Sequence, residues 1–192
     1  MSDLRRWHYR LSRADGQTWA LMVAVDPDTF ECRSPAPEAC EWTALARHQC
    51  PNCPLDPAAV PLCPLAARLA PVVGAIGSLL SHDAVDVEIE DGARLTRGRI
   101  PVQVAASSLI GLISAVSGCP RTAFLRPMAW FHLPLATEEE TIFRATATYL
   151  LSQYFTRESG HEPDWQLAGL KQRYEELHHV NVAMAARLRE AG

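Results

Sequence analysis

VDVEIEDGARLTRGRIPVQ, residues 85–103, alternates apolar and acidic side chains over its first six positions. This two-residue period is typical of a β-strand with one buried face. Asp91-Gly92 follows at once, and this dipeptide favours the tight turn between two antiparallel strands. We therefore expect a β-hairpin over residues 84–103.

A second hairpin is predicted near the amino terminus. WHYRLSR (7–13) and QTWALMVAV (17–25) are rich in aromatic and β-branched residues and flank the turn signal Ala14-Asp15-Gly16. Residues 1–39 then carry the N-terminal hairpin, and residues 40–80 carry a Cys-Pro loop and a helix. Together the two hairpins are expected to form a small antiparallel sheet.

Residues 104–192 have helical patterns. ASSLIGLISAVSG ends at Gly118, where a left-handed helix cap is common. Thr137 and Glu140 have the spacing of a capping box, which predicts a helix that runs to about Thr156. Its apolar stripe, which we expect in the core, consists of Phe143, Ala147, Leu150, Leu151 and Tyr154. The predicted fold class is α+β, a sheet packed against a mainly helical C-terminal half in a single domain of residues 1–192.

The last predicted helix, residues 164–190, begins near Pro163 and carries a heptad pattern. Its a and d positions are Leu167, Leu170, Tyr174, Leu177, Asn181, Met184 and Leu188. An asparagine at an a position commonly fixes the register of two helices, so a homodimer through this helix is one interpretation. Packing of the same seam within one chain is the other.

Composition narrows the class of partner and the compartment. The formal net charge of -4, from 18 basic and 22 acidic residues, argues against nucleic acid as a partner. The two most apolar stretches are residues 60–80, interrupted by prolines and Arg68, and residues 102–118, which are short for a bilayer. MSDLRRWHYRLSR lacks the apolar region of a signal peptide. We expect a cytoplasmic protein with no membrane association.

The six cysteines fall into two groups. Four precede proline, three of them in CPNCPLDPAAVPLCPLAARL (50–69); these four are Cys50, Cys53, Cys63 and Cys119. Disulfides are rare in a reducing cytoplasm, and proline holds the residue before it out of helix in a stiff loop. We therefore predict that these four cysteines bind an iron–sulfur cluster, most simply a four-iron cluster, in a redox or sensing protein.

Three other interpretations of the cysteines stay open. A structural zinc site in a non-catalytic interaction module would use the same thiolates, with His48 or Cys40 as substitute ligands. A thiol–disulfide redox protein would need only Cys50 and Cys53, one of them exposed and with a lowered pKa. The cysteines can also be small buried hydrophobic residues. His132, among apolar residues in MAWFHLPLA, is a candidate to support a metal ligand or a core histidine.

The sequence leaves open whether the protein is an enzyme. Ser81-His82-Asp83 is adjacent in sequence only, and no glycine pattern for nucleotide phosphates is present.

CPNCPL, CPLA, SGCP, RPMAWFHLPLAT and EETIFRATATYLLSQYF together resemble a family of uncharacterised bacterial proteins, a domain of unknown function with shared Cys-Pro and Phe-His-Leu-Pro segments. The resemblance covers about residues 40–190. It implies that the four Cys-Pro cysteines and His132 stand at positions characteristic of the family, and it implies no activity, cofactor or partner.

Overall fold

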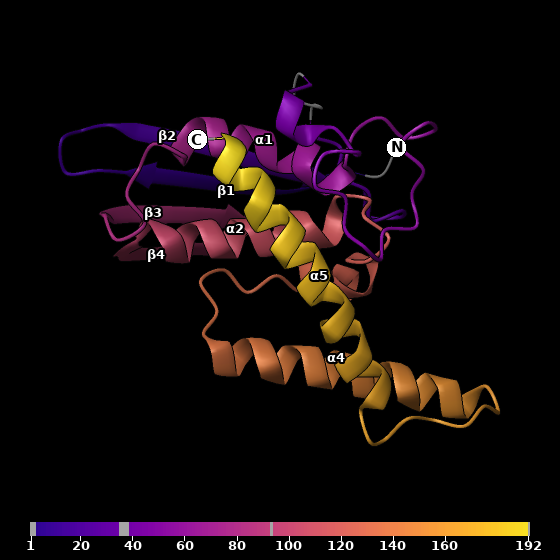
Figure 1. The fold of residues 1–192 in the computed structure, drawn as a ribbon. Coiled ribbons are helices and arrows are strands. Elements are labelled where there is room, and N and C mark those ends of the chain that lie inside the picture. The colour runs from indigo at the N-terminus through magenta and orange to yellow at the C-terminus, as the bar shows by residue number, and fades with distance from the viewer. Residues whose placement is uncertain (1–2, 35–38, 93, 192) are drawn as a thin grey trace.

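The computed structural model describes residues 3–34, 39–92 and 94–191. Its strands form two hairpins, β1 (Arg5–Ser12) with β2 (Thr18–Val25) and β3 (Ala84–Asp91) with β4 (Arg94–Pro101). The hairpins join into one antiparallel sheet in the order β2-β1-β3-β4 (Figure 1). Gly92 has a φ of 57°, which glycine adopts readily, so it suits the turn between β3 and β4. Both predicted hairpins and the fold class are confirmed.

The sheet has one buried and one solvent-facing side. Trp7, Tyr9 and Leu11 on β1 and the three apolar residues of VDVEIE on β3 are at most 1% exposed. Leu11 pairs with Val87, so the two buried rows lie side by side. On the opposite side, Arg97 and Arg10 lie within ion-pair distance of Glu88. The alternation in the sequence thus separates the core from solvent.

Five α-helices and two short 3₁₀ segments complete the described part of the chain. They are α1 (Pro64–Ile76), α2 (Val102–Val116), α3 (Arg126–Trp130), α4 (Glu138–Glu158) and α5 (Ala168–Ala191), with η1 (Glu41–Thr43) and η2 (Ala123–Leu125). Helix α1 packs on β2, and α2 packs on β3, β4 and α1. Gly118, with a φ of 90°, follows the end of α2 as predicted.

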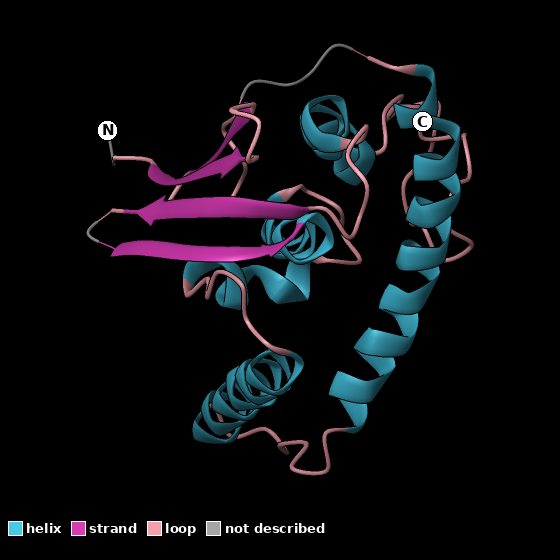
Figure 2. Cartoon of the chain, turned by 90° about the vertical axis from the view of Figure 1, so that its left-hand side faces the viewer, coloured by secondary structure: helices cyan, strands magenta, loops and turns pink. Residues whose placement is uncertain are grey.

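Helix α5 crosses the length of the molecule, and α4 stands away from the sheet beside the start of α5 (Figures 1 and 2). The second half of α5 packs on α1 and η1 and buries Val180, Ala183, Met184 and Arg187. Asn181 is exposed and lies off this buried side. The late part of the heptad therefore packs within the chain.

The prediction that the apolar stripe of α4 lies in the core is wrong. Of the 21 residues of α4, only Ala145 is buried, whereas Phe143 is 73% exposed and Leu151 58%. The capping box itself is confirmed, since Thr137 accepts from the Glu140 amide and Glu140 accepts from the Thr137 amide.

Helix α5 also begins later than expected, at Ala168. Leu167 has a φ of 63°, which breaks the helix before it. Asp164 acts from outside the helix, because its carboxylate accepts from the Gly169 amide at 2.7 Å and from the Tyr149 hydroxyl at 2.9 Å. Proline at position 163 is thus part of the loop.

None of the helices in the described ranges is both long and apolar enough to cross a bilayer.

Candidate functional site

A cavity of about 550 Å³ lies between α2 and the α3–α4–α5 part of the molecule. We call it the α2/α4 cavity. Its walls come from one side of α2, from α3, from the segment 131–136 and from α4 and α5, and they are mainly apolar. Pockets that hold small molecules commonly have 300–1,000 Å³ and apolar walls with a few polar groups. The α2/α4 cavity has the size and lining of such a site.

Helix α2 leaves room for the cavity because its side facing the cavity carries small residues. Ser107, Ser108, Gly111 and Ala115 recur there at helical spacing. A Cβ built on Gly111 would meet nothing within 4 Å. These small residues therefore line open space.

The polar end of the cavity is a short chain of hydrogen bonds. The Tyr9 hydroxyl lies 2.6 Å from Nε2 of His132 and 3.1 Å from Oγ of Ser108. Ser108 Oγ also accepts from the Leu135 amide at 3.1 Å, which ties the segment after α3 to α2. An imidazole nitrogen is a stronger acceptor than a serine hydroxyl, so we assign the Tyr9 proton to the bond with His132. His132 then keeps its own proton on Nδ1.

His132 is neutral at physiological pH. It is 8% exposed, and burial, reinforced by the charge of Arg144, lowers its pKa from 6.5 to about 4. Burial also raises the pKa of Tyr9, so the phenol stays protonated. The pair is a fixed neutral hydrogen-bonding group in an apolar wall.

Arg144 supplies the cationic group at the cavity. Its Nη2 donates to the carbonyls of Met128 at 2.5 Å and Phe131 at 2.8 Å, which fixes the guanidinium against the end of α3. Burial lowers its pKa, although Arg remains protonated. Among the described residues, no carboxylate lies within ion-pair distance of it; Glu140, which is bonded at the Thr137 cap, acts on Arg144 only from a longer distance. The cavity thus has one half-buried cation without a carboxylate in direct contact.

Sequence reasoning found only part of this site. The position of His132 among apolar residues indicates either a core histidine or a support for a metal ligand, and neither interpretation places it at a cavity. Tyr9 and Ser108 are separated from each other by 99 residues along the chain, so no local pattern indicates that they meet. The sequence does mark Arg144 as a candidate site residue, because it is the one charged residue in TIFRATATYLLSQYFT, residues 141–156.

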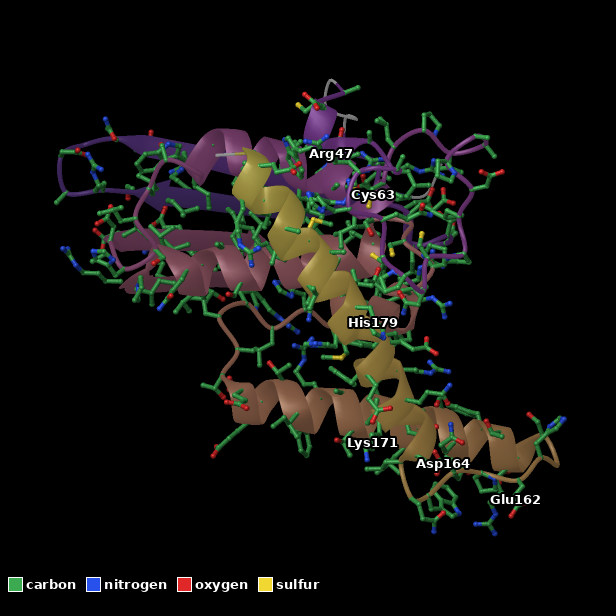
Figure 3. All side chains as sticks on the ribbon, in the orientation of Figure 1. Arg47, Cys63, Glu162, Asp164, Lys171 and His179 are labelled. Carbon is green, nitrogen blue, oxygen red and sulfur yellow. The ribbon has the colours of Figure 1, made fainter. Side chains whose placement is uncertain are left out.

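The four Cys-Pro cysteines all border one small apolar cavity, of about 20 Å³, beside the second half of α5. Figure 3 labels Cys63 in this coil-rich part of the molecule, far from Asp164 and Glu162 near the loop that joins α4 to α5. Cys63 is 8% exposed, and the other three are half-buried against the core. The cavity has room for about one water molecule.

The iron–sulfur prediction and the zinc alternative are wrong. Within the described ranges, no group of three or more His, Cys, Asp or Glu residues is placed to hold a metal ion. Burial raises the pKa of Cys50 to about 11 and also raises the pKa of Cys119.

The thiol–disulfide alternative fails for a related reason. It required a lowered pKa at the Cys50–Cys53 pair, whereas the pKa of Cys50 is raised. No disulfide joins any of the six cysteines, all of which are described. The four Cys-Pro side chains pack in or against the hydrophobic core, as small hydrophobic residues do.

Proline follows Cys50, Cys63 and Cys119 for reasons of local geometry. Cys53 donates its amide to the Cys50 carbonyl at 2.9 Å, and Thr122 to the Cys119 carbonyl at 3.2 Å. Each pair closes a turn with proline in the second position, which proline favours. Cys63 precedes the first residue of α1, where proline is also favoured.

The two substitute ligands lie apart from this cavity. His48 pairs through Nε2 with Glu190 at 2.7 Å, near the end of α5. Cys40 precedes η1, where its backbone amide and carbonyl both bond to the Thr43 hydroxyl. The structure therefore brings the four Cys-Pro cysteines to one cavity and leaves His48, Cys40 and His132 outside its lining.

Comparison with known proteins gives a family and no activity. A family model described as a domain of unknown function, DUF6901, matches residues 7–192. No curated protein and no solved structure matches the chain significantly. The chain therefore belongs to DUF6901, and the resemblance to a domain of unknown function is confirmed.

Proposed function

We propose that this member of the DUF6901 family is a binding protein for a small molecule with an apolar body and an anionic group. The α2/α4 cavity is the site. The observation that carries the proposal is Arg144, a half-buried guanidinium that faces an apolar cavity and has no carboxylate partner among the described residues.

The Arg144 guanidinium has lost part of its hydration, and a bound anion would compensate for that loss. A cation removed from water loses hydration, and its pKa falls unless an anion compensates; the pKa of Arg144 is lowered by burial. A bound carboxylate would supply the missing partner, and the guanidinium geometry suits two parallel hydrogen bonds to it. The two backbone carbonyls hold the guanidinium in place before a ligand arrives.

The apolar walls of the α2/α4 cavity determine what the rest of the ligand can be. Leu112, Leu125 and Leu177 are among the apolar wall residues, and the small side of α2 leaves the space between them open. His132 is neutral and so adds no second charge to the cavity. A flexible aliphatic or compact aromatic body therefore fits the walls better than a polar one.

The experiment is calorimetric titration with octanoate and with octan-1-ol, which share a chain and differ in charge. We expect octanoate to bind at least about tenfold more tightly than the alcohol, a difference of about 1.4 kcal/mol. Arg144→Met should reduce octanoate binding to the level of octan-1-ol.

Two glycine variants test the place of binding. In Gly111→Phe the new side chain enters the α2/α4 cavity without a clash at Cβ, so octanoate binding should be lost. Gly74→Phe is the matched control, since Gly74 is also helical, exposed and free of neighbours within 4 Å, but lies on α1. Equal binding of octanoate by wild type and Gly111→Phe, or no binding by wild type, would overturn the proposal.

A further inference from the structure

We infer that the outward side of α4 is the contact surface of a homodimer in which the α4 helices of two copies pack antiparallel. This inference is independent of the ligand proposed for the α2/α4 cavity. It rests on the exposure of one stripe of α4 and on the charges at the two ends of that helix.

The outward stripe consists of Phe143, Ala147, Leu150, Leu151 and Tyr154, of which Leu150 is half-buried and the others are exposed; Leu151 stands at its edge, beside a pocket between α3, α4 and α5. Phe143 is 73% exposed, Leu151 58% and Tyr154 49%. The steps of three and four residues place these side chains on one side of the helix, so they form a continuous surface. Scattered apolar residues on a protein surface are normal, whereas a contiguous patch marks an interaction site.

The opposite side of α4 is already used within the chain. Ala145 is buried, and the Tyr149 hydroxyl donates to Asp164 in the loop before α5. Helix α4 packs on α3 there. The outward stripe, in contrast, lacks a covering layer among the described residues.

The charges of α4 indicate which molecule covers it. Glu139 lies in the first turn and Arg157 in the last. They are separated by 157 − 139 = 18 residues, about five turns at 3.6 residues per turn, so both lie on the same flank of the stripe. An antiparallel pair about a two-fold axis sets Glu139 of each copy opposite Arg157 of the other, twice.

The charged residues and the apolar stripe also have the same centre along α4, as an antiparallel pair requires. The midpoint of Glu139 and Arg157 is position 148, and the midpoint of Phe143 and Tyr154 is 148.5, so charged ends and apolar middle share one axis. A parallel pair would oppose Glu139 with its own copy, which is repulsive. The surface is therefore complementary to itself, which favours a second copy over an unrelated partner.

Sedimentation velocity at about 1–100 μM protein tests the inference, a range in which dimers of micromolar Kd dissociate measurably. We expect wild type to shift from monomer to dimer. Phe143→Glu combined with Leu151→Glu should leave only monomer, with unchanged far-ultraviolet circular dichroism. Ile142→Glu is the matched control, because Ile142 is 58% exposed on the same turn but lies off the stripe.

A charge exchange tests the antiparallel arrangement directly. Glu139→Arg alone and Arg157→Glu alone should each weaken dimerisation at least about tenfold, and the double variant should restore it. Val182→Glu distinguishes a dimer through α4 from a dimer through residues 164–190, because Val182 is 57% exposed on α5 near Asn181. This variant should still dimerise. A monomeric wild type, failure of the exchange to restore dimers, or loss of dimers in Val182→Glu instead would overturn the inference.

Discussion

Arg187 is 1% exposed and satisfies its charge without a carboxylate. Its Nη1 donates to the carbonyls of Trp42 and Ala44, each at 2.7 Å, and its Nη2 to that of Leu45 at 3.1 Å. The side chain thereby attaches the segment around η1 to the second half of α5. One arginine thus adds three hydrogen bonds to a segment in which only Glu41–Thr43 is helical.

Arg187→Ala should lower the free energy of unfolding by about 3 kcal/mol, because the carbonyls of Trp42 and Leu45 lose this donor and that of Ala44 keeps only the Arg47 amide. Urea denaturation measures this change. Arg189→Ala, at an exposed position on the same helix, is the control and should change stability by less than about 0.5 kcal/mol. Similar losses in both variants would contradict the assigned role.

His132 makes stability depend on pH in a defined window. Its pKa is about 4 in the folded protein and 6.5 when exposed. The unfolded chain therefore binds the proton first, so stability is full above about pH 6.5 and is lost as the pH falls toward 4. The shift corresponds to a maximum loss of about 3 kcal/mol.

His132→Gln should remove this loss, since glutamine does not titrate and can still accept from Tyr9. Unfolding free energies of wild type and variant, measured from pH 7 to pH 4, should converge toward the acidic end. His82→Gln changes an exposed histidine and should keep the wild-type profile. If the difference in unfolding free energy between wild type and His132→Gln stays constant with pH, His132 is not a buried neutral histidine.

At the residue scale, the sequence indicated His132 and the four Cys-Pro cysteines but not their roles. At three of the four, the proline has a local cause, because it stands in a turn or at the start of a helix. In the sequence, this cause looks the same as the positioning of a ligand. Arg187 was not detected, because the carbonyls it binds are more than 140 residues away along the chain. Long-range contacts of this kind have no local signature.

Helix α2 offers a direct test at the scale of one element. Gly111 lies within the helix with open space around its Cβ position. Gly111→Ala should therefore raise the free energy of unfolding by about 0.5–1 kcal/mol, as helix propensity dictates. Thermal unfolding monitored by circular dichroism at 222 nm suffices to measure it.

Gly77→Ala supplies the contrast for this prediction. A Cβ at Gly77 would lie 2.5 Å from the Val73 carbonyl oxygen, so this variant should lose stability. If both variants shift stability in the same direction, open space at Gly111 is not the determining factor.

Secondary elements were largely predictable because their signals are local. The alternation over residues 85–90, the turn glycines and the Thr137–Glu140 box each act within a few residues of where they stand. The surface position of the α4 stripe was not predictable. Helical spacing shows that one side of a helix is apolar, but it does not say whether the same chain or another molecule covers that side.

For the whole molecule, dimerisation through α4 should make thermal stability depend on concentration. The unfolding midpoint of wild type should rise as protein concentration increases, since association stabilises the folded state by mass action. Phe143→Glu/Leu151→Glu should show no such dependence. Calorimetric scans at two concentrations are sufficient, and an unchanged wild-type midpoint would argue for a stable monomer.

The strand order β2-β1-β3-β4 has a consequence for how the chain reaches this structure. Each hairpin closes within a few residues, but the two are joined by β1 and β3, where Trp7 pairs with Asp91 across 91 − 7 = 84 residues. During synthesis, the β1–β2 hairpin is complete long before β3, with which β1 pairs, has been made. Trp7, Tyr9 and Leu11 are then without their cover until β3, α1 and α2 have emerged. The meeting of the two hairpins is the step of high contact order, and it should limit the rate of folding.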